Sequence, residues 1–397
     1  MQIPAQSFGD YGAGIYKGTQ MIIPDLEQKT KNNSGDTQVN PSLGILTKLS
    51  STSDITAYQN YRDDRYKLQN IAADVLNHSR LSSCGKSLSP APKEKRIISA
   101  RGSEVRINKN HETGKCNYEG LMLCGNVWVC PVCAARITLE RKNELLSADL
   151  EGYHTGLLTL TLKHSYRDTL SDLSADLTKM RNSLKSGRWW NEFRRDNGLA
   201  GAITIREVTY GKHGWHVHYH MLMVFNGPVN YKNLEGEIYD RWSSIAARHG
   251  RYTSRDHGVD FRECEQLDYI TKWSIHSELV YGERKEGRQG NITVWEMLRR
   301  IGQGEDKYKP LFKEYAKCFK GKKQLVWGRG LKKLLGVGVE AESDGEEQEN
   351  ERVITICYED WKRIIKNKER AHILRLAEVS GSVGVIARLA YLEAMEH

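Results

Sequence analysis

Polar and apolar positions alternate most clearly in residues 203–225, ITIREVTYGKHGWHVHYHMLMVF. His216, His218 and His220 occupy every second position, so they point to one face of a predicted strand. The MLMVF run that follows is apolar throughout, as expected for a strand buried on both faces. The preceding AITIREVTY reads as a second strand, and GKHG at 211–214 as the turn between them. The pattern therefore predicts an antiparallel hairpin that carries three histidines on one face.

The register of this hairpin decides what lies beside the histidines. An even-length turn at 211–214 places Glu207 directly opposite His218 and on the same face as His220. An odd-length turn moves Glu207 to the other face. One carboxylate and two imidazoles that converge from adjacent strands can hold a divalent cation, Mg²⁺ or Mn²⁺, with positions left open for water or phosphate. His216 remains an alternative ligand, because the alternation alone does not say which two histidines bind.

A second segment, RECEQLDYITKWSIHSELV at 262–280, follows a helical period. Glu265, Tyr269 and Lys272 are spaced so that they share one face of this predicted helix. A Tyr beside a metal is a candidate nucleophile for phosphodiesters, which would leave a phosphotyrosine and release a 3′-OH. Glu265 would then activate water, and Lys272 would stabilise negative charge. Taken alone, the same spacing also fits ordinary packing and surface ion pairs.

A Cys-rich segment, CGNVWVCPVCAARI, occupies residues 124–137. The Cys130-Pro-Val-Cys133 unit forms a tight knuckle suited to tetrahedral Zn²⁺, and Cys124 supplies a third thiol. The fourth ligand is one of three upstream residues: Cys84, Cys116 or His111. Cys84 is favoured narrowly, because a Gly follows it as a Gly follows Cys124. A thioredoxin-like redox pair is less suitable, since no βαβ pattern surrounds the motif. The other three cysteines are expected to be free, packed thiols: Cys264, Cys318 and Cys357.

Charge is concentrated in one stretch of the chain. The 397 residues contain 59 Lys and Arg against 50 Asp and Glu, a net charge of +9. Residues 307–333 alone hold ten Lys and Arg against one acid. Their net charge of +9 equals the net charge of the whole chain. Tyr, Phe and Trp alternate with the basic residues, and this favours nucleic-acid contact over a merely solvated helix face. The candidate DNA-contacting residues are Lys313, Lys317, Lys320, Lys322, Lys323, Arg329, Lys332 and Lys333.

Together these segments resemble the HUH endonucleases, in particular the plasmid rolling-circle replication initiator (Rep) proteins. The family's Thr-alternating strand is matched by LLTLTLK at 157–163, and its His-hydrophobic-His motif by His218 and His220 around a Tyr. Its Tyr-x-x-Lys helix is matched by Tyr269 and Lys272. Glu265, four residues before the Tyr, matches the branch with one Tyr and one Glu. The sequence departs from the family where Val, not Pro, precedes the first of these two His.

The resemblance implies a fold, an activity and partners. The expected fold is α+β, with a central five-stranded antiparallel sheet that carries the two His and has helices packed against it. The third metal ligand in the family is commonly a carboxylate or polar residue on a neighbouring strand, a place that Glu207 suits. The implied activity is metal-dependent, site-specific nicking and joining of one DNA strand, with Tyr269 linked to the 5′ end and the 3′-OH used as a primer. The expected partners are plasmid origin DNA, both duplex and single-stranded, a host helicase and the replication machinery.

Other interpretations remain open. A single-Tyr transposase or relaxase would use the same site, and a zinc-stabilised DNA-binding regulator would have no catalysis. A barrel-type oxidative enzyme with a His-bound metal explains neither the Tyr helix nor the basic stretch. No run of apolar residues is long enough to span a membrane, and no signal peptide is evident, so a cytoplasmic protein is expected.

The chain is expected to divide into six segments. They are a polar, partly disordered leader (1–80), a Cys-rich zinc module (81–150), a nicking domain (151–285), a basic DNA-binding segment (286–339), an acidic linker (340–351) and a small helical C-terminal domain (352–397).

Overall fold

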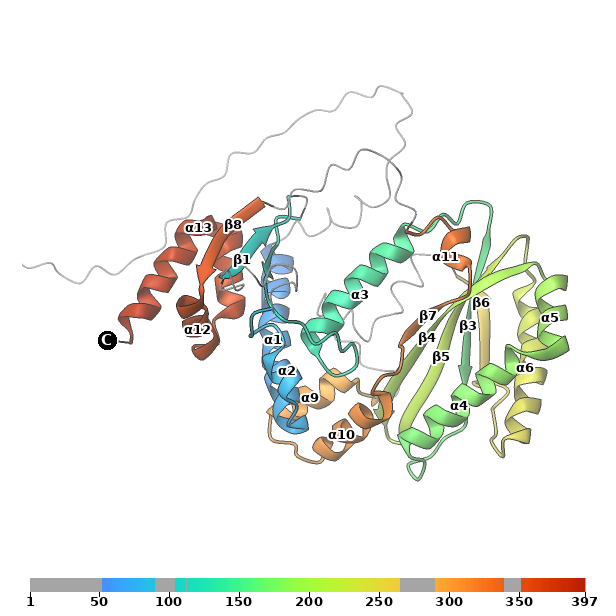
Figure 1. Ribbon diagram of the computed structural model, residues 1–397. Helices are drawn as coiled ribbons and strands as arrows, with labels where there is room; N and C mark the ends of the chain where they lie inside the picture. Colours follow the sequence, from blue (N-terminus) through green and yellow to red (C-terminus); the bar gives the residue numbers. More distant parts are fainter. Residues whose placement is uncertain (1–51, 90–103, 112, 265–289, 339–350, 397) are drawn as a thin grey trace, which may run out of the picture.

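The computed structural model describes residues 52–89, 104–111, 113–264, 290–338 and 351–396 (Figure 1). Its larger sheet has five strands in the order β6-β3-β5-β4-β7, and every neighbouring pair is antiparallel. The strands are β3 (His154–Thr161), β4 (Leu199–Gly211), β5 (Gly214–Phe225), β6 (Val259–Glu263) and β7 (Leu325–Trp327). The expected α+β architecture with a five-stranded antiparallel sheet is confirmed, and the His-bearing strand β5 lies at its centre.

The β4–β5 hairpin has the even-length turn that the sequence analysis considered. Gly211 pairs with Gly214, and Glu207 pairs with His218. Gly214 has φ of +87°, and a Cβ at this position would lie 2.9 Å from the Cα of Tyr166. Both the backbone conformation and the close approach therefore require glycine at the start of β5.

One face of the large sheet is covered by helices. The alternating residues Trp215, Val217 and Tyr219 of β5 point to this face and are buried. The helices on this face include α4 (Leu170–Leu184) against β5, α5 (Gly187–Asp196) against β4, and α6 (Tyr231–Arg248) against β6. The apolar surface of each helix closes the main hydrophobic core.

The opposite face is divided into two halves. Leu222 and Val224 of β5 pack there against α11 (Leu331–Leu334) and the last residues of α3 (Pro131–Leu146). Nearer the start of β5, the same face carries His216, His218 and His220 instead of apolar residues. The polar half of this face is the place where a functional site can form.

Helices from distant parts of the chain extend the main core. Leu68, Ala72 and Ala73 of α1 (Thr52–Leu76) are buried in it, so the predicted leader contains a helix that is part of the folded core. This helix contacts α3, α9 (Val294–Gly302) and α10 (Tyr308–Phe319), and is followed by the short α2 (Ser79–Ser83).

A second sheet joins the Cys-rich segment to the C-terminal segment. It has the order β2-β1-β8, formed by β1 (Glu104–Lys109), β2 (Cys116–Glu119) and β8 (Glu351–Cys357). Helices α12 (Tyr358–Lys366) and α13 (Arg370–Ala394, kinked at Gly381) pack against it. The expected helical C-terminal domain therefore begins with a strand, and it shares a sheet with residues that the sequence analysis assigned to the zinc module. In the described ranges, no helix is both long and apolar enough to cross a membrane.

Candidate functional site

Two neighbouring strands bring together the carboxylate and the two imidazoles expected from the hairpin register. Nε2 of His218 lies 2.7 Å from Oε2 of Glu207, and Nε2 of His220 lies 2.8 Å from the same oxygen. The cluster lies on β4 and β5, next to each other in the middle of the sheet. The rigid centre of the sheet thus positions all three side chains.

The three side chains fit a divalent cation in both ligand type and spacing. Their ligand atoms all lie within 4.8 Å of one another. In an octahedral site with bonds of about 2.1 Å, adjacent ligands are about 3 Å apart, close to the two observed N–O distances. Two imidazoles and one carboxylate on one side of the ion would leave the other coordination positions open.

A neighbouring strand fixes the orientation of one imidazole. Nδ1 of His220 lies 3.0 Å from Oγ1 of Thr159 on β3, the residue that pairs with His220 in the sheet. This contact leaves Nε2 of His220 directed at Glu207. Metal-bound histidines commonly use their second nitrogen in this way, which sets the tautomer and the ring orientation.

Glu207 is ionised in this environment. Burial by itself would raise the pKa of the Glu207 carboxyl. Electrostatic interaction and hydrogen bonds with His218 and His220 outweigh burial and hold the pKa of Glu207 well below its ordinary value. A carboxylate kept in its charged form is the form that binds a cation.

His216 lies beside this cluster, and Glu207 contacts the other two histidines instead. The His216 ring is 4.9 Å from that of His218 and 5.0 Å from that of His164. Burial and the neighbouring histidines lower the pKa of His216 to about 3, so its ring is neutral at ordinary pH. The sequence analysis did not single out His164; its only signal is its place directly after the LLTLTLK strand.

The predicted nucleophile helix lies outside the described residues. Glu265, Tyr269 and Lys272 all fall in the range 265–289, so their roles stay predictions. The described chain ends beside this range at Cys264, which is buried in the apolar half of the face that carries the histidines. The backbone N–H of Cys264 donates to the carbonyl of Thr155 on β3.

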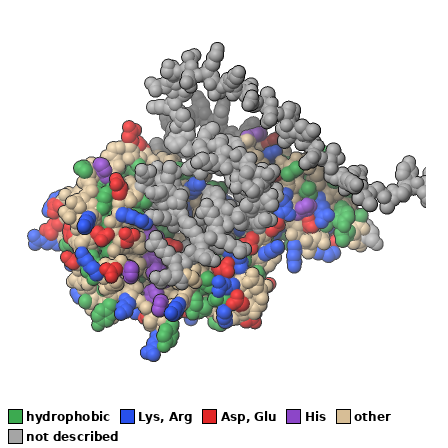
Figure 2. All heavy atoms as spheres, turned by 180° about the vertical axis from the view of Figure 1, so that it is seen from behind, with side chains coloured by type: hydrophobic (Ala, Val, Ile, Leu, Met, Phe, Trp, Pro, Cys, Tyr) green, Lys and Arg blue, Asp and Glu red, His purple; other side chains and the backbone are tan. Residues whose placement is uncertain are grey.

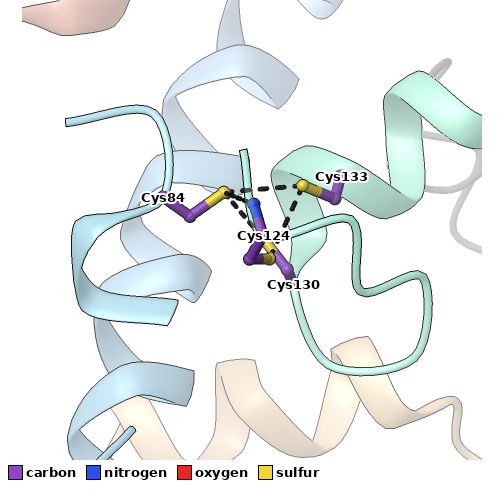
Figure 3. Close-up of side chains that lie close together, drawn as sticks. All are labelled: Cys84, Cys124, Cys130 and Cys133. Carbon is purple, nitrogen blue, oxygen red and sulfur yellow. Dashed lines mark hydrogen bonds between the residues drawn. The ribbon is translucent and has the colours of Figure 1, made fainter. Parts of the chain in front are cut away.

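Four cysteine thiols form a second cluster (Figure 3). The Sγ of Cys133 lies 3.4 Å from that of Cys84 and 3.6 Å from that of Cys124, and the Sγ atoms of Cys130 and Cys84 are 3.7 Å apart. Four thiolates around Zn²⁺ at about 2.3 Å would be about 3.8 Å apart, so the sulfur positions fit a tetrahedral ion. Hydrogen bonds from Cys124, Cys130 and Cys84 lower the pKa of the Cys133 thiol, which favours the thiolate that zinc requires.

The geometry selects Cys84 from the three possible fourth ligands. Cys84 follows α2 and reaches the start of α3, whereas Cys116 lies on β2 and is absent from the cluster, as is His111. Burial raises the pKa of Cys116 to about 11, so this thiol remains protonated. The other three cysteines form no disulfide within the described residues: Cys264 and Cys318 are buried, while Cys357 is exposed, which the expectation of a packed thiol did not foresee.

The basic stretch combines exposed charge with buried rings. Seven of the eight candidate DNA-contacting residues are exposed: Lys313, Lys317, Lys320, Lys322, Lys323, Arg329 and Lys333. Lys332 is partly buried and pairs with Glu144 at 2.8 Å. The interleaved aromatics Phe312, Tyr315 and Phe319 are part of the main core. Their spacing therefore reflects an amphipathic helix, so these rings do not support DNA contact, and DNA contact by the basic residues stays a prediction.

The molecular surface carries both signs of charge. Figure 2 shows Lys and Arg side chains intermixed with Asp and Glu over the visible face, with several His side chains close together at the border of the grey atoms. The basic excess in the sequence thus does not make this visible face uniformly positive.

Two curated proteins are similar to this chain. "Protein rep" from Streptomyces lividans is 27% identical over 302 residues, which cover 57% of this chain and 66% of that protein. "Neomycin resistance protein" from Streptomyces cyanogenus is 29% identical over 137 residues, 27% of this chain and 31% of that protein. The chain spans less than two thirds of the length of either relative. No family model matches the sequence, and no solved structure matches it. The chain is therefore similar to a Rep protein over more than half of its own length.

Proposed function

We propose that this protein is a plasmid rolling-circle replication initiator that nicks and rejoins one DNA strand at the origin. The observation that carries the proposal is the convergence of Glu207, His218 and His220 on the central strands of an antiparallel sheet. Similarity to a protein named Rep supports a role in replication.

The metal cluster would bind the scissile phosphate. Glu207, His218 and His220 would hold Mg²⁺ or Mn²⁺, which would supply electrostatic stabilisation of the negative charge on the phosphate oxygens. Thr159 keeps His220 in the required orientation, and the sheet keeps the three ligands at fixed distances.

Tyr269 is the proposed nucleophile, and its place in the chain follows from the predicted helix at 262–280. The backbone N–H of Cys264 donates to the carbonyl of Thr155 on β3, the strand next to the one that carries the histidines. Tyr269 is five positions after Cys264, so the predicted helix would place it about 8 Å further on, at about 1.5 Å per residue. Tyr269 therefore follows closely in sequence on the sheet that carries the cluster.

The bond changes follow from a transesterification. The Tyr269 oxygen attacks phosphorus, forms a phosphotyrosine on the 5′ end and releases a 3′-OH that serves as a primer. Lys272 stabilises the negative charge of the phenolate and the phosphate. Glu265 takes a proton from water or a second nucleophile when the strand is released at termination.

A His₂-carboxylate set also occurs in iron oxygenases, so the surrounding fold is relevant. In the part of the chain that is described, the sheet is open, with β6 and β7 as its edges, and does not close into a barrel. The exposed lysines of α10 and of the α10–β7 loop are suited to a polyanionic substrate. Both features favour the nuclease proposal.

The test is to incubate the full-length protein and Mn²⁺ with a supercoiled plasmid that carries the candidate origin. We expect nicked DNA with the protein covalently attached to its 5′ end. Tyr269→Phe should bind the DNA and form no adduct, His218→Ala should lose nicking, and Tyr391→Phe on the exposed face of α13 should act as the wild type. An adduct of normal yield with Tyr269→Phe, or full nicking by His218→Ala, contradicts the proposal. DNA binding without any nick would instead favour the non-catalytic regulator.

A further inference from the structure

We propose that Arg181, Arg206 and Lys322 form a binding site for a phosphate group on the helix-covered side of the sheet. This site is separate from the Glu207–His218–His220 cluster, because Arg206 and Glu207 are successive residues of β4 and point to opposite faces. It lies between β4, α4 and the loop that joins α10 to β7 (Figure 1).

Arg206 is the buried part of the site, with only 6% of its surface exposed. Its guanidinium donates to three hydroxyl groups, those of Tyr219, Ser174 and Thr178, the last at 2.8 Å. None of these partners carries a negative charge. A buried cation without a counter-charge is costly, so this arrangement favours a bound anion.

Two further cations lie beside the residues that hold Arg206. Nζ of Lys322 lies 3.4 Å from Oγ of Ser174, the oxygen that also accepts from Arg206. The Arg181 guanidinium lies 4.8 Å from the centre of the Tyr219 ring, and that of Arg206 lies 5.1 Å from it. Nε of Arg181 is buried and has no hydrogen-bond partner among the described residues. Arg181, Arg206 and Lys322 therefore all lie beside Ser174 or Tyr219.

The acidic residues of the surrounding helices are engaged elsewhere. On α4, Asp172 bonds the capping Thr169, and Asp176 pairs with Arg251 at 2.9 Å. On α10, the only acid is Glu314, which accepts from the indole of Trp215 and from a backbone N–H at the start of α4. Helices α4 and α10 thus supply no carboxylate to pair with Arg181, Arg206 or Lys322.

The backbone around Lys322 is held in place. The indole N–H of Trp128 donates to the carbonyl of Lys322 at 2.7 Å, and the N–H of Lys322 donates to Phe319. The N–H of Arg206 donates to the carbonyl of Gln324 at 3.0 Å, which ties the loop to β4. The three cations are consequently presented by fixed backbone, and a tetrahedral anion is the ligand that two guanidinium groups and an ammonium can share.

A phosphate group can come from two sources, a phosphodiester of bound DNA or free inorganic phosphate. We assign it to a DNA phosphodiester, an assignment that rests on the proposed function. Lys322 is exposed, so the site is open to solvent on that side. A contact here would lie on the opposite side of the sheet from the cleavage site, and the DNA would pass around the β7 edge.

The first measurement is thermal unfolding of the full chain with inorganic phosphate, compared with chloride at equal ionic strength. We expect phosphate to raise Tm of the wild type, and Arg181→Gln with Lys322→Gln to abolish the rise. The matched control, Arg248→Gln with Lys232→Gln, removes the same charge from exposed positions on α6 and should keep the phosphate effect. Arg206→Lys provides a single-residue check that retains the buried charge, and it should weaken the phosphate effect.

The second measurement is DNA affinity as a function of salt. Loss of one phosphate contact should reduce the slope of log K against log salt by about 1 in the Arg181/Lys322 variant. An unchanged slope together with a lost phosphate effect would identify free phosphate as the ligand. Equal responses of the two double variants to phosphate, or no phosphate effect on the wild type, would overturn the site. Neither measurement depends on nicking. Failure of the phosphate site can therefore be distinguished from failure of the proposed enzyme activity.

Discussion

Thr159 is the residue that sets the direction in which His220 points. Its hydroxyl contacts Nδ1 of His220 at 3.0 Å, while the other ring nitrogen faces Glu207. Thr159→Val keeps the shape of the side chain and removes this contact. We expect Mn²⁺ affinity to fall by about 10- to 100-fold, as is usual when the hydrogen-bond partner of a metal-bound His is lost.

Thr161 supplies the matched control for this prediction. It lies on the same face of β3 and pairs with His218 in the sheet, but its hydroxyl donates to the carbonyl of His257, and among the described residues it forms no hydrogen bond with the three ligands. Titration calorimetry with Mn²⁺ should show near-normal affinity for Thr161→Val. Equal affinities for the two variants would mean that His220 does not need Thr159 for its orientation.

At the scale of elements, the loop at residues 84–86 connects the two ends of the described chain. Three consecutive carbonyls accept hydrogen bonds from different helices: Cys84 from Gln69 of α1, Gly85 from Arg370 of α13, and Lys86 from Trp361 of α12. Arg370 is buried, so its charge lies near the thiolates of the cluster. An ion that fixes this loop would therefore stabilise the packing of α12 and α13 as well.

Removal of one thiol tests this connection. Cys133→Ser should lose bound zinc, lower Tm and increase hydrogen exchange in residues 370–392, because the metal contributes folding free energy. Cys357→Ser is the control, since Cys357 is an exposed cysteine outside the cluster. Loss of zinc with unchanged exchange in α13 would show that the C-terminal helices pack independently of the metal.

The elements that the sequence predicted best are those whose information is local. The alternation around His218 and the GKHG turn specify one hairpin, so its register and the position of Glu207 followed from a few residues. The pairing of β8 with β1 could not be predicted, because Glu104 and Cys357 are far apart in the sequence and both strands are short. The burial of the α10 rings could not be predicted from the sequence, because a buried stripe and a DNA-contacting surface can have the same residue types.

The candidate site shows the same limit. Ligand chemistry selected Glu207, His218 and His220, yet the contact with Thr159 depends on a third strand that no local pattern placed beside them. Arg206 carried no signal at all, since its partners lie on α4 and β5. Side chains that act through tertiary contacts are the part of a site that sequence patterns leave out.

At the scale of the whole molecule, two exposed tyrosines lie at the end of the sheet where β4 turns into β5. Tyr166 is 72% and Tyr252 is 75% exposed. The backbone of Tyr166 approaches Gly214, and the carbonyl of Tyr252 accepts from the N–H of Lys163 at the end of β3. His164 lies two residues before Tyr166 in the chain, and its ring is 5.0 Å from that of His216. Both tyrosines are therefore close to the edge of the histidine cluster.

Exposed rings beside basic side chains are suited to unpaired bases, because every base can stack on an aromatic ring. Tyr166→Ala with Tyr252→Ala should weaken binding of a single-stranded origin oligonucleotide by about 2–6 kcal/mol, at about 1–3 kcal/mol for each lost stack. Duplex binding should change little, since it depends on phosphate contacts. The control is Tyr358→Ala with Tyr391→Ala, which removes two exposed rings from α12 and α13. Fluorescence anisotropy at one salt concentration distinguishes the cases: equal single-strand affinities for the two double variants would exclude these tyrosines as the platform on which the strand lies before it is cut.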